Sequence, residues 1–527
     1  MSTRQITCLV LALACYVVIM IIIGIRSLKK TSTTQDYFLG GRGLGSWVAA
    51  LSAQASDMSG WLLMGLPGSI YFGGTGKIWI AIGLFFGTVL NWLVISKRLR
   101  RYTIIAGNSM TLPEFFENRF HDKKKVILTI SSIVITVFFL VYTASAFTSG
   151  GKLFNTVFGV DYHLALIIVA VIVLAYTFLG GFWAVCNTDF VQGLLMIVGV
   201  LTVPIVAFAL MGGDINGALA SSGVTDPDYL NIFYADGQPY PMVSILSDLA
   251  WGLGYCGMPH ILVRFMAIKN ERDINKSTVV ATVWVLISLA AACVIGVIGR
   301  GFIPEIDDAE NVFIEMIQKI FTDNTVLLFI GGILLCGILA AIMSTADSQL
   351  LVCASSVSKD IYKNLLHPKI EDRKILSLSR VTVLLVAVIA IIIAWDPESS
   401  IMNMVSDAWA GLGAAFGPVV VCSLFWKRTN LAGAVAGILS GGIFVIVWDY
   451  IPMVKAVEVM KGFTRTKMIT MYEKTGIYSL LIGFFVSLLI IVIVSLMTKA
   501  PSKEMIDEFE RVSEYYDPDE EEKSVEE

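Results

Sequence analysis

The chain has 527 residues, of which 56% are hydrophobic and only 15% are charged. Soluble domains carry about 25% charged residues, so this composition excludes a water-soluble protein. The net charge of −4 gives no reason to expect a nucleic acid as a partner. Apolar stretches of about 20 residues recur along the chain, and they predict an all-α integral membrane protein in a lipid bilayer.

Hydropathy predicts about thirteen membrane-spanning helices. They cover residues 6–26, 45–71, 77–96, 126–155, 162–180, 184–211, 243–266, 277–300, 326–357, 378–395, 401–425, 431–451 and 476–498. The first stretch is too long for a signal peptide and lacks a small-residue cleavage site. We therefore expect one transmembrane domain over residues 1–500, followed by an acidic, partly disordered cytoplasmic tail over residues 501–527.

The loops alternate in charge along the chain. Lys and Arg accumulate after the first, third, seventh, ninth and eleventh predicted spans, for example at Arg98 and Arg101 and at Arg264 and Lys269. The loops after the sixth and eighth spans are acidic. Because cytoplasmic loops carry excess Lys and Arg, we expect the N-terminus outside and the C-terminus inside.

The sequence lacks the motifs expected of metal-binding proteins, ATP-driven pumps and hydrolases. The eight cysteines are scattered without CxxC spacing, as are the four histidines, so we expect neither disulfides nor a metal site built from them. A Walker motif, HExxH and GxSxG are also missing from suitable positions, which argues against an ATP-driven pump and against an enzyme.

The second predicted span contains a run that suits a lipid-facing helix poorly, Ala55-Ser56-Asp57-Met58-Ser59-Gly60. Small residues permit the helix to unwind, and the freed backbone carbonyls then need a partner at membrane depth. A dehydrated sodium ion is such a partner. Asp57 is costly in hydrocarbon and is therefore a functional candidate. The alternative is a small-residue packing face with Asp57 near the membrane interface.

The seventh predicted span contains three glycines and one proline within residues 252–259. A straight helix disfavours this composition, since Pro259 also lacks a backbone donor. We predict a second broken helix, with Trp251 and Tyr255 as aromatic walls. Two interrupted helices at corresponding positions in two halves mark the binding site of an inverted-repeat transporter. A glycine-rich packing seam is the alternative.

The ninth predicted span combines hydroxyl groups with an acidic residue. Four small or hydroxyl residues share one helix face: Ala341, Ser344, Thr345 and Ser348. Their oxygens suit sodium, although Ser and Thr can also bond to their own helix backbone. Asp347 lies about 100° round the helix from Ser348 and is a candidate for a second cation site. Asp189, which opens the sixth span, is either another ligand or a helix-end charge.

Several stretches together resemble the sodium/solute symporter family, and within it the sodium/proline symporters. The resemblance runs from about residue 5 to residue 500. The matching stretches are SDMSGWLLMGLPG at 56–68, TDxxQ at 188–192, WGLGYCGMPHILVRFMA at 251–267, ILAAIMST at 338–345 followed by QLLVCAS, and WAGLGAAFGPVV at 409–420.

The resemblance implies a leucine-transporter-type core of 5+5 inverted repeats, at about residues 45–211 and 243–425. It implies a sodium site formed by Ala55, Met58, Ala341, Ser344 and Thr345. It also implies a proline site lined by Ser59, Trp61, Gly65, Tyr142, Trp251, Tyr255 and Pro259. Asp57 would shape the broken helix or its sodium affinity, and Arg42 would act in cytoplasmic gating or coupling. In some relatives the residue at Asp189 helps to form a further sodium site, near which Asp347 and Ser348 would lie here.

The implied function is sodium-coupled symport of L-proline into the cell by alternating access, across what the resemblance implies is a bacterial plasma membrane, with sodium as the cofactor. Proline suits such a pocket because half-helix N-termini attract its carboxylate and aromatic faces attract its ammonium group. One alternative is a symporter of the same fold for a betaine, pantothenate or another amino acid. A transporter-like membrane sensor is a second, but the tail is too short for a signalling domain. An ion channel is a third, but it would need pore-loop signatures.

Overall fold

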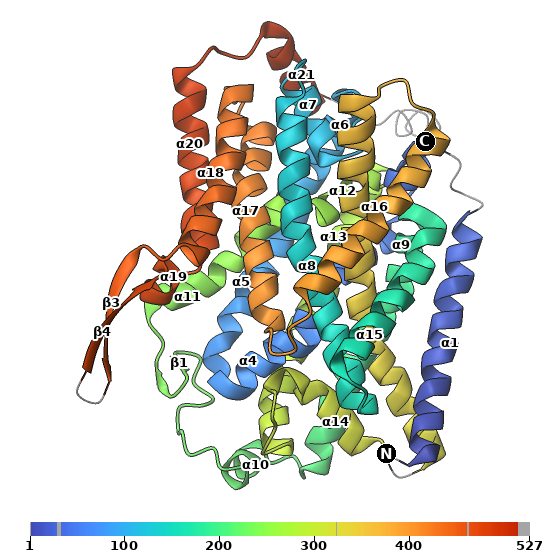
Figure 1. Cartoon of the computed structure of the whole chain (residues 1–527), viewed down its shortest axis with the longest axis vertical. Helices are drawn as coiled ribbons and strands as arrows, with labels where there is room; N and C mark the ends of the chain where they lie inside the picture. Colours follow the sequence, from blue (N-terminus) through green and yellow to red (C-terminus); the bar gives the residue numbers. More distant parts are fainter. Residues whose placement is uncertain (1, 29–32, 323, 461–462, 515–527) are drawn as a thin grey trace, which may run out of the picture.

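Long apolar helices make up most of the chain (Figure 1). The computed structural model describes residues 2–28, 33–322, 324–460 and 463–514. Within these ranges, ten helices are long and apolar enough to cross a membrane. A further apolar helix, Tyr162–Phe178, is shorter. The helices of the predicted second and seventh spans are interrupted.

The first part of the chain forms the elements α1 (Thr3–Leu28), α2 (Thr34–Leu39), η1 (Gly40–Arg42), α3 (Ser46–Asp57), η2 (Trp61–Gly65), α4 (Leu66–Gly73), η3 (Thr75–Lys77), α5 (Ile78–Leu90), η4 (Asn91–Ile95), α6 (Ser96–Ile105), α7 (Leu112–Arg119), α8 (Val126–Phe158), α9 (Tyr162–Leu210) and α10 (Ile215–Ser221). The long α9 bends at Gly181, whose φ of 55° is a conformation that glycine adopts readily. This bend separates the predicted spans 162–180 and 184–211.

The second part forms β1 (Tyr234–Ala235), β2 (Gln238–Pro239), α11 (Met242–Leu249), η5 (Ala250–Gly257), α12 (Pro259–Ala267), α13 (Glu271–Phe302), η6 (Ala309–Asn311), α14 (Val312–Ile320), α15 (Thr325–Ser355), η7 (Ser356–Leu366), α16 (Asp372–Ile393), α17 (Ile401–Phe425), α18 (Leu431–Tyr450), β3 (Val454–Met460), β4 (Phe463–Ile469), α19 (Met471–Thr475), α20 (Ser479–Met497) and α21 (Lys503–Glu514). The strands pair as two antiparallel hairpins, β1 with β2 and β3 with β4.

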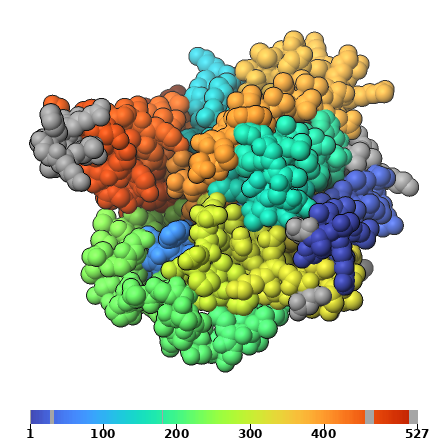
Figure 2. Space-filling view, turned by 60° about the horizontal axis from the view of Figure 1, so that its bottom comes forward, coloured from blue at the N-terminus to red at the C-terminus, as the bar shows by residue number. Residues whose placement is uncertain are grey.

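The two ends of the bundle carry different elements. α6, α7 and α21 lie at the upper end in Figure 1, whereas α10 and α14 lie at the lower end, where α1 begins, and the β3–β4 hairpin projects from the left side. Figure 2 turns the lower end forward and shows the green segment after α9 beside yellow segments from the middle of the chain. The chain therefore enters the bundle at one end and reaches α21 at the other.

The acidic tail begins with a helix. Within the tail of residues 501–527, which we expect to be partly disordered, Lys503–Glu514 form α21, while residues 515–527 lie outside the described part of the chain. Met505 and Val512 are buried on one face of α21. On the same face the Phe509 ring lies against α6, with its centre 4.9 Å from the Arg98 guanidinium carbon.

Both predicted interruptions are confirmed. α3 ends at Asp57, and the chain resumes helical geometry with η2 and α4. Further along, α11 passes at Ala250 into the tight 3₁₀ turns of η5, and α12 begins at Pro259. Every residue from 259 to 267 is buried, as is every residue from 49 to 57. The interruptions therefore lie inside the bundle and face other helices rather than lipid.

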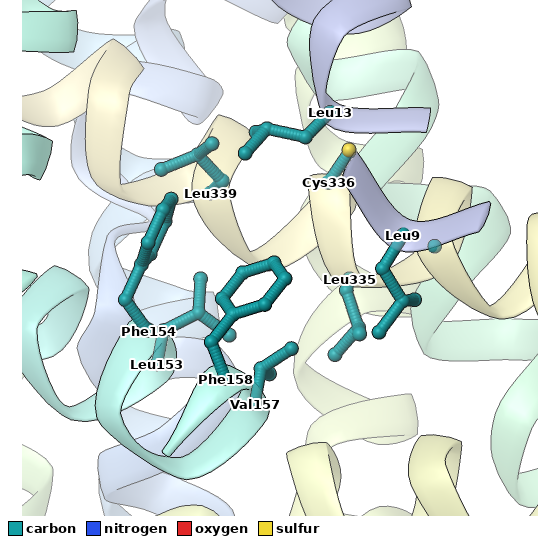
Figure 3. A pocket seen from close by; sticks show the side chains of 10 residues that line it. Leu9, Leu13, Leu153, Phe154, Val157, Phe158, Leu335, Cys336 and Leu339 are labelled. Atoms are coloured by element: carbon teal, nitrogen blue, oxygen red, sulfur yellow. The ribbon is translucent and has the colours of Figure 1, made fainter. Parts of the chain in front are cut away.

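A small apolar pocket lies among α1, α8 and α15 (Figure 3). Its lining consists of Leu9, Leu13, Leu153, Phe154, Val157, Phe158, Gly332, Leu335, Cys336 and Leu339. These side chains offer no charged or strongly polar group to a zwitterion, whose burial without partners is costly. The candidate site for a charged solute therefore lies elsewhere, at the interrupted helices.

Candidate functional site

The backbone leaves helical geometry directly after Asp57. Met58 adopts φ −81° and ψ 78°. The Asp57 carbonyl accepts hydrogen bonds from the Ser59 N–H at 3.0 Å and from the Trp61 Nε1–H at 2.9 Å. The Asp57 carboxylate is fully buried and accepts a hydrogen bond from the Tyr255 hydroxyl at 2.6 Å. Its other oxygen, Oδ1, has no donor among the described residues, which suits a site that receives a cation or a ligand donor.

α15 meets α3 at the same level. The Ser344 hydroxyl donates to the Ala55 carbonyl at 2.7 Å and lies 3.2 Å from the Ala341 carbonyl. The Thr345 hydroxyl oxygen is buried and has no partner within the described ranges. Three of the five predicted sodium ligands thus converge at the contact between α3 and α15, with Thr345 beside them, while Met58 caps the end of α3. Carbonyl and hydroxyl oxygens of this kind suit a sodium ion.

Aromatic side chains surround the first interruption. Four of the residues predicted to line the substrate pocket contact one another or Asp57 there: Ser59, Trp61, Tyr142 and Tyr255. The Tyr142 hydroxyl lies 3.5 Å from the Asp57 carbonyl. Trp251 lies four residues before Tyr255 in η5, and the Trp409 side chain contacts both of these rings.

The other two predicted pocket residues face different ends of the bundle. Gly65 lines a cavity of about 670 Å³ near the lower end, where Lys152 pairs with Glu310 at 2.7 Å. Pro259 lines a cavity of only about 20 Å³, which extends toward Thr111 between α6 and α7. Of these two cavities, the one that Gly65 lines toward the α14 end is the larger.

The residues predicted to form a second cation site also come together, but around an arginine. The Arg264 guanidinium donates to the Asp189 carboxylate at 3.2 Å and to the Ser348 hydroxyl at 2.6 Å. Asp347 accepts hydrogen bonds from the Ser348 hydroxyl at 3.3 Å and from the Tyr176 hydroxyl at 2.7 Å. Arg264 therefore supplies a positive charge beside Asp189 in this arrangement.

Our placement of Arg264 in a basic loop was wrong. Its side chain is 1% exposed and lies within α12. Positive charge counts locate the ends of spans, but they do not tell a loop arginine from one inside the last turns of a helix. The signal in the sequence was the position of Arg264 within the apolar run PHILVRFMA, where an ionisable residue is itself a functional candidate.

Arg42 lies at the α6 end of the bundle. It occupies η1 with a positive φ of 54°. Its guanidinium donates to the Met266 carbonyl at 2.6 Å, to the Ser109 carbonyl at 2.9 Å and to the Asn108 side chain at 2.9 Å. These bonds join the end of α12 to the loop between α6 and α7. A role of Arg42 in gating stays a prediction.

Sequence reasoning assigned no role to His260. Its imidazole is fully buried and packs edge-on against Phe139 and Tyr142, at centroid distances of 5.5 and 6.1 Å. Neither ring nitrogen has a hydrogen-bond partner among the described residues. A buried imidazole next to Pro259 belongs to the surroundings of the candidate site, and only the position of His260 directly after Pro259 could have indicated this.

The profile described as the sodium:solute symporter family matches residues 37–441. The chain belongs to this family. Sodium/proline symporters of Staphylococcus aureus strains JH9 and COL are each 43% identical to this family member over 497 residues, which cover 93% of its chain and 92% of theirs. The family that the motifs indicated is thereby confirmed.

Two solved structures share the fold of this symporter-family chain. A substrate-bound, outward-open structure of a Na⁺-coupled sialic acid symporter gives a TM-score of 0.74 at 17% identity, covering 95% of this chain and 99% of that one. A closed structure of a nucleobase-cation-symport-1 family transporter gives 0.54 at 10% identity, covering 90% and 98%. The predicted all-α leucine-transporter-type fold is therefore confirmed, whereas the repeat boundaries 45–211 and 243–425 stay a prediction.

Proposed function

We propose that this protein is a secondary active symporter that carries L-proline into the cell together with sodium. Its 43% identity over 497 residues to proteins named sodium/proline symporters supports the substrate and the coupling ion. The observation that carries the sodium site is the contact between α3 and α15, where the Ser344 hydroxyl lies 2.7 Å from the Ala55 carbonyl. A cation placed there touches both the interrupted helix and its neighbour.

The proposed sodium ligands are Ala55, Met58, Ala341, Ser344 and Thr345. In this proposal sodium coordinates the backbone carbonyls at the end of α3, and it holds this end against α15. Since the adjacent residues Ser59 and Trp61 belong to the proposed substrate pocket, ordering the interruption also completes that pocket. Sodium and proline are then positively coupled, so each raises the affinity for the other.

The proposed proline pocket is lined by Ser59, Trp61, Gly65, Tyr142, Trp251, Tyr255 and Pro259. The N-terminus of α12 begins at Pro259 and carries partial positive charge, which favours the carboxylate of the substrate. The tyrosine and tryptophan faces suit the pyrrolidine ring and its ammonium group. Asp57 organises the interruption through its bond to Tyr255.

The proposed orientation places the α6 end in the cytoplasm and the α14 end outside a plasma membrane. Basic residues such as Arg98 and Arg101 gather at the α6 end, while Asp307 and Asp308 line the cavity at the α14 end. Rocking of the two proposed repeats, 45–211 and 243–425, then alternates access to the central site. Arg42, with its bonds between α12 and the α6–α7 loop, acts in the cytoplasmic gate.

Proline uptake by purified protein in liposomes tests this proposal. We expect radiolabelled L-proline to accumulate under an inward sodium gradient and not under an equal potassium gradient. Excess unlabelled proline should compete, whereas betaine, pantothenate and other amino acids should not. Accumulation equal to that of empty liposomes, from monodisperse protein, would overturn the substrate, and equal uptake in sodium and potassium would overturn the coupling ion.

A further inference from the structure

Trp409 of α17 reaches into the second interrupted helix. Its indole is 1% exposed, and its Nε1–H donates to the Trp251 carbonyl at 2.8 Å. A methyl group added at Gly254 would lie 2.0 Å from this indole nitrogen, so the glycine is what admits the ring. The tight turns of η5 leave backbone carbonyls that need partners outside the segment, and Trp409 supplies one of them.

The same indole touches two residues of the proposed proline pocket. Its ring stacks on Trp251 with a centroid distance of 6.4 Å and an interplanar angle of 26°. It meets Tyr255 edge-on at 5.1 Å and 85°. Tyr255 in turn bonds to Asp57 of the first interruption. The Trp409 indole therefore packs against both the Trp251 and the Tyr255 ring.

Tyr478 supports Trp251 from outside the proposed repeats. It lies directly before α20, beyond residue 441 where the family match ends. Its ring stacks on Trp251 at 5.1 Å and 21°. Its hydroxyl donates to the Ser406 carbonyl at 2.8 Å, and its backbone N–H donates to the Ser247 hydroxyl at 3.2 Å. The backbone bond and the stacking on Trp251 place the Tyr478 ring, and the hydroxyl adds a further bond at the edge of the ring.

We propose that Trp409 and Tyr478 are positioning residues that hold the Trp251 and Tyr255 rings at a fixed spacing and thereby set the ring size that the pocket accepts. This inference rests on the proposed function. Aromatic walls move when their supporting rings are removed, since neither Trp251 nor Tyr255 sits in a regular α-helix. A pocket with movable walls discriminates less well between substrates that differ by one methylene, which is normally worth about tenfold or more.

The test measures competition by three cyclic imino acids whose rings have four, five and six members: azetidine-2-carboxylate, proline and pipecolate. We would compare wild-type protein with Trp409→Phe, which lacks the indole N–H, and with Tyr478→Leu, which lacks the stacked ring. Tyr478→Phe keeps the ring and loses only the bond to Ser406. The matched control is Trp79→Phe, because the Trp79 indole also donates to a backbone carbonyl, that of Ile232 at 2.8 Å.

We expect Trp409→Phe and Tyr478→Leu to reduce the preference for proline over both other rings by about tenfold. Tyr478→Phe and Trp79→Phe should retain the wild-type preference, and the sodium concentration for half-maximal uptake should stay near the wild-type value in all four variants. A merely structural role would lower the amount of active protein without changing the ratio of inhibition constants.

The outcomes separate the two hypotheses. Wild-type protein that shows no preference for proline overturns the proposed substrate. A wild-type preference that both Trp409→Phe and Tyr478→Leu preserve overturns the positioning role and leaves the proposed function intact. If Trp409→Phe is not monodisperse in detergent, the comparison between Tyr478→Leu and Tyr478→Phe decides the question.

Discussion

Different interactions stabilise the two helix interruptions. At the first, the Asp57 carbonyl and carboxylate take up hydrogen bonds from side chains, and one carboxylate oxygen has no donor among the described residues. At the second, glycines allow backbones to touch: a methyl group at Gly252 would lie 2.2 Å from the Gly83 carbonyl oxygen, and one at Gly257 would lie 2.7 Å from the Gly417 nitrogen. Changes at the first interruption should therefore alter ion dependence, and changes at the second should alter folding and pocket shape.

The largest expected effect comes from Asp57→Ala. This change removes the buried acceptor of the Tyr255 hydroxyl, whose bond to a charged group is worth about 1.5–3 kcal/mol. We expect sodium-driven uptake to fall roughly 100-fold. Uptake into liposomes, normalised to the amount of monodisperse protein, measures it. Asp57→Asn keeps an acceptor oxygen and should lose less, so equal losses in the two variants would contradict a role for the hydrogen bond.

Gly254→Ala tests the second interruption. Its new methyl group would overlap the Trp409 indole, and overpacking of this kind costs about 1–3 kcal/mol. We expect a lower unfolding temperature in detergent and little change in the sodium dependence of the remaining activity. Gly442→Ala is the control, because its nearest neighbour would lie 3.8 Å away. A Gly254→Ala protein as stable as the control would contradict the close contact between Gly254 of η5 and the Trp409 indole of α17.

Ser344→Ala probes the contact between the first interruption and α15. It removes the hydroxyl that lies against the Ala55 carbonyl. Loss of one oxygen ligand should raise the sodium concentration for half-maximal uptake by about tenfold, with a smaller effect on proline affinity at saturating sodium. Ser440→Ala, which removes a hydroxyl bonded to its own helix at Gly437, serves as control. An unchanged sodium curve would exclude Ser344 as a ligand.

Much of this contrast was predictable from the sequence, because polar residues and glycines in apolar segments are conspicuous. Asp57 and the cluster over residues 252–259 marked the two interruptions directly. Contacts across long sequence distances were not predictable: Trp409 meets Trp251 only because α17 returns to η5. The helix α21 was not predicted, because acidic residues outnumber the apolar ones in its sequence. Its apolar residues Met505, Phe509 and Val512 lie on one face and pack against the bundle. Local composition therefore predicts where a helix is interrupted, but it does not predict which distant side chains pack against the interruption.

The smallest expected effect comes from Asp347→Asn, and it tests whether the polar network beyond the first interruption includes a second cation site. Asparagine retains an acceptor for the Tyr176 hydroxyl and removes only the charge. Because Arg264 already places a positive charge beside Asp189, we expect a modest shift of the sodium curve to higher concentrations, about fivefold, at the lower end of typical coupling between sites.

A sodium titration of proline uptake, fitted for both midpoint and steepness, measures the effect of Asp347→Asn. Tyr176→Phe is the matched comparison, since it removes the hydroxyl partner and leaves the Asp347 charge in place. A shift in Asp347→Asn that Tyr176→Phe does not share assigns the effect to charge and favours a second ion. If neither substitution shifts the sodium titration curve, Asp347 does not contribute to ion binding. The sodium dependence of uptake would then be set by the contact between α3 and α15 at the first interruption alone.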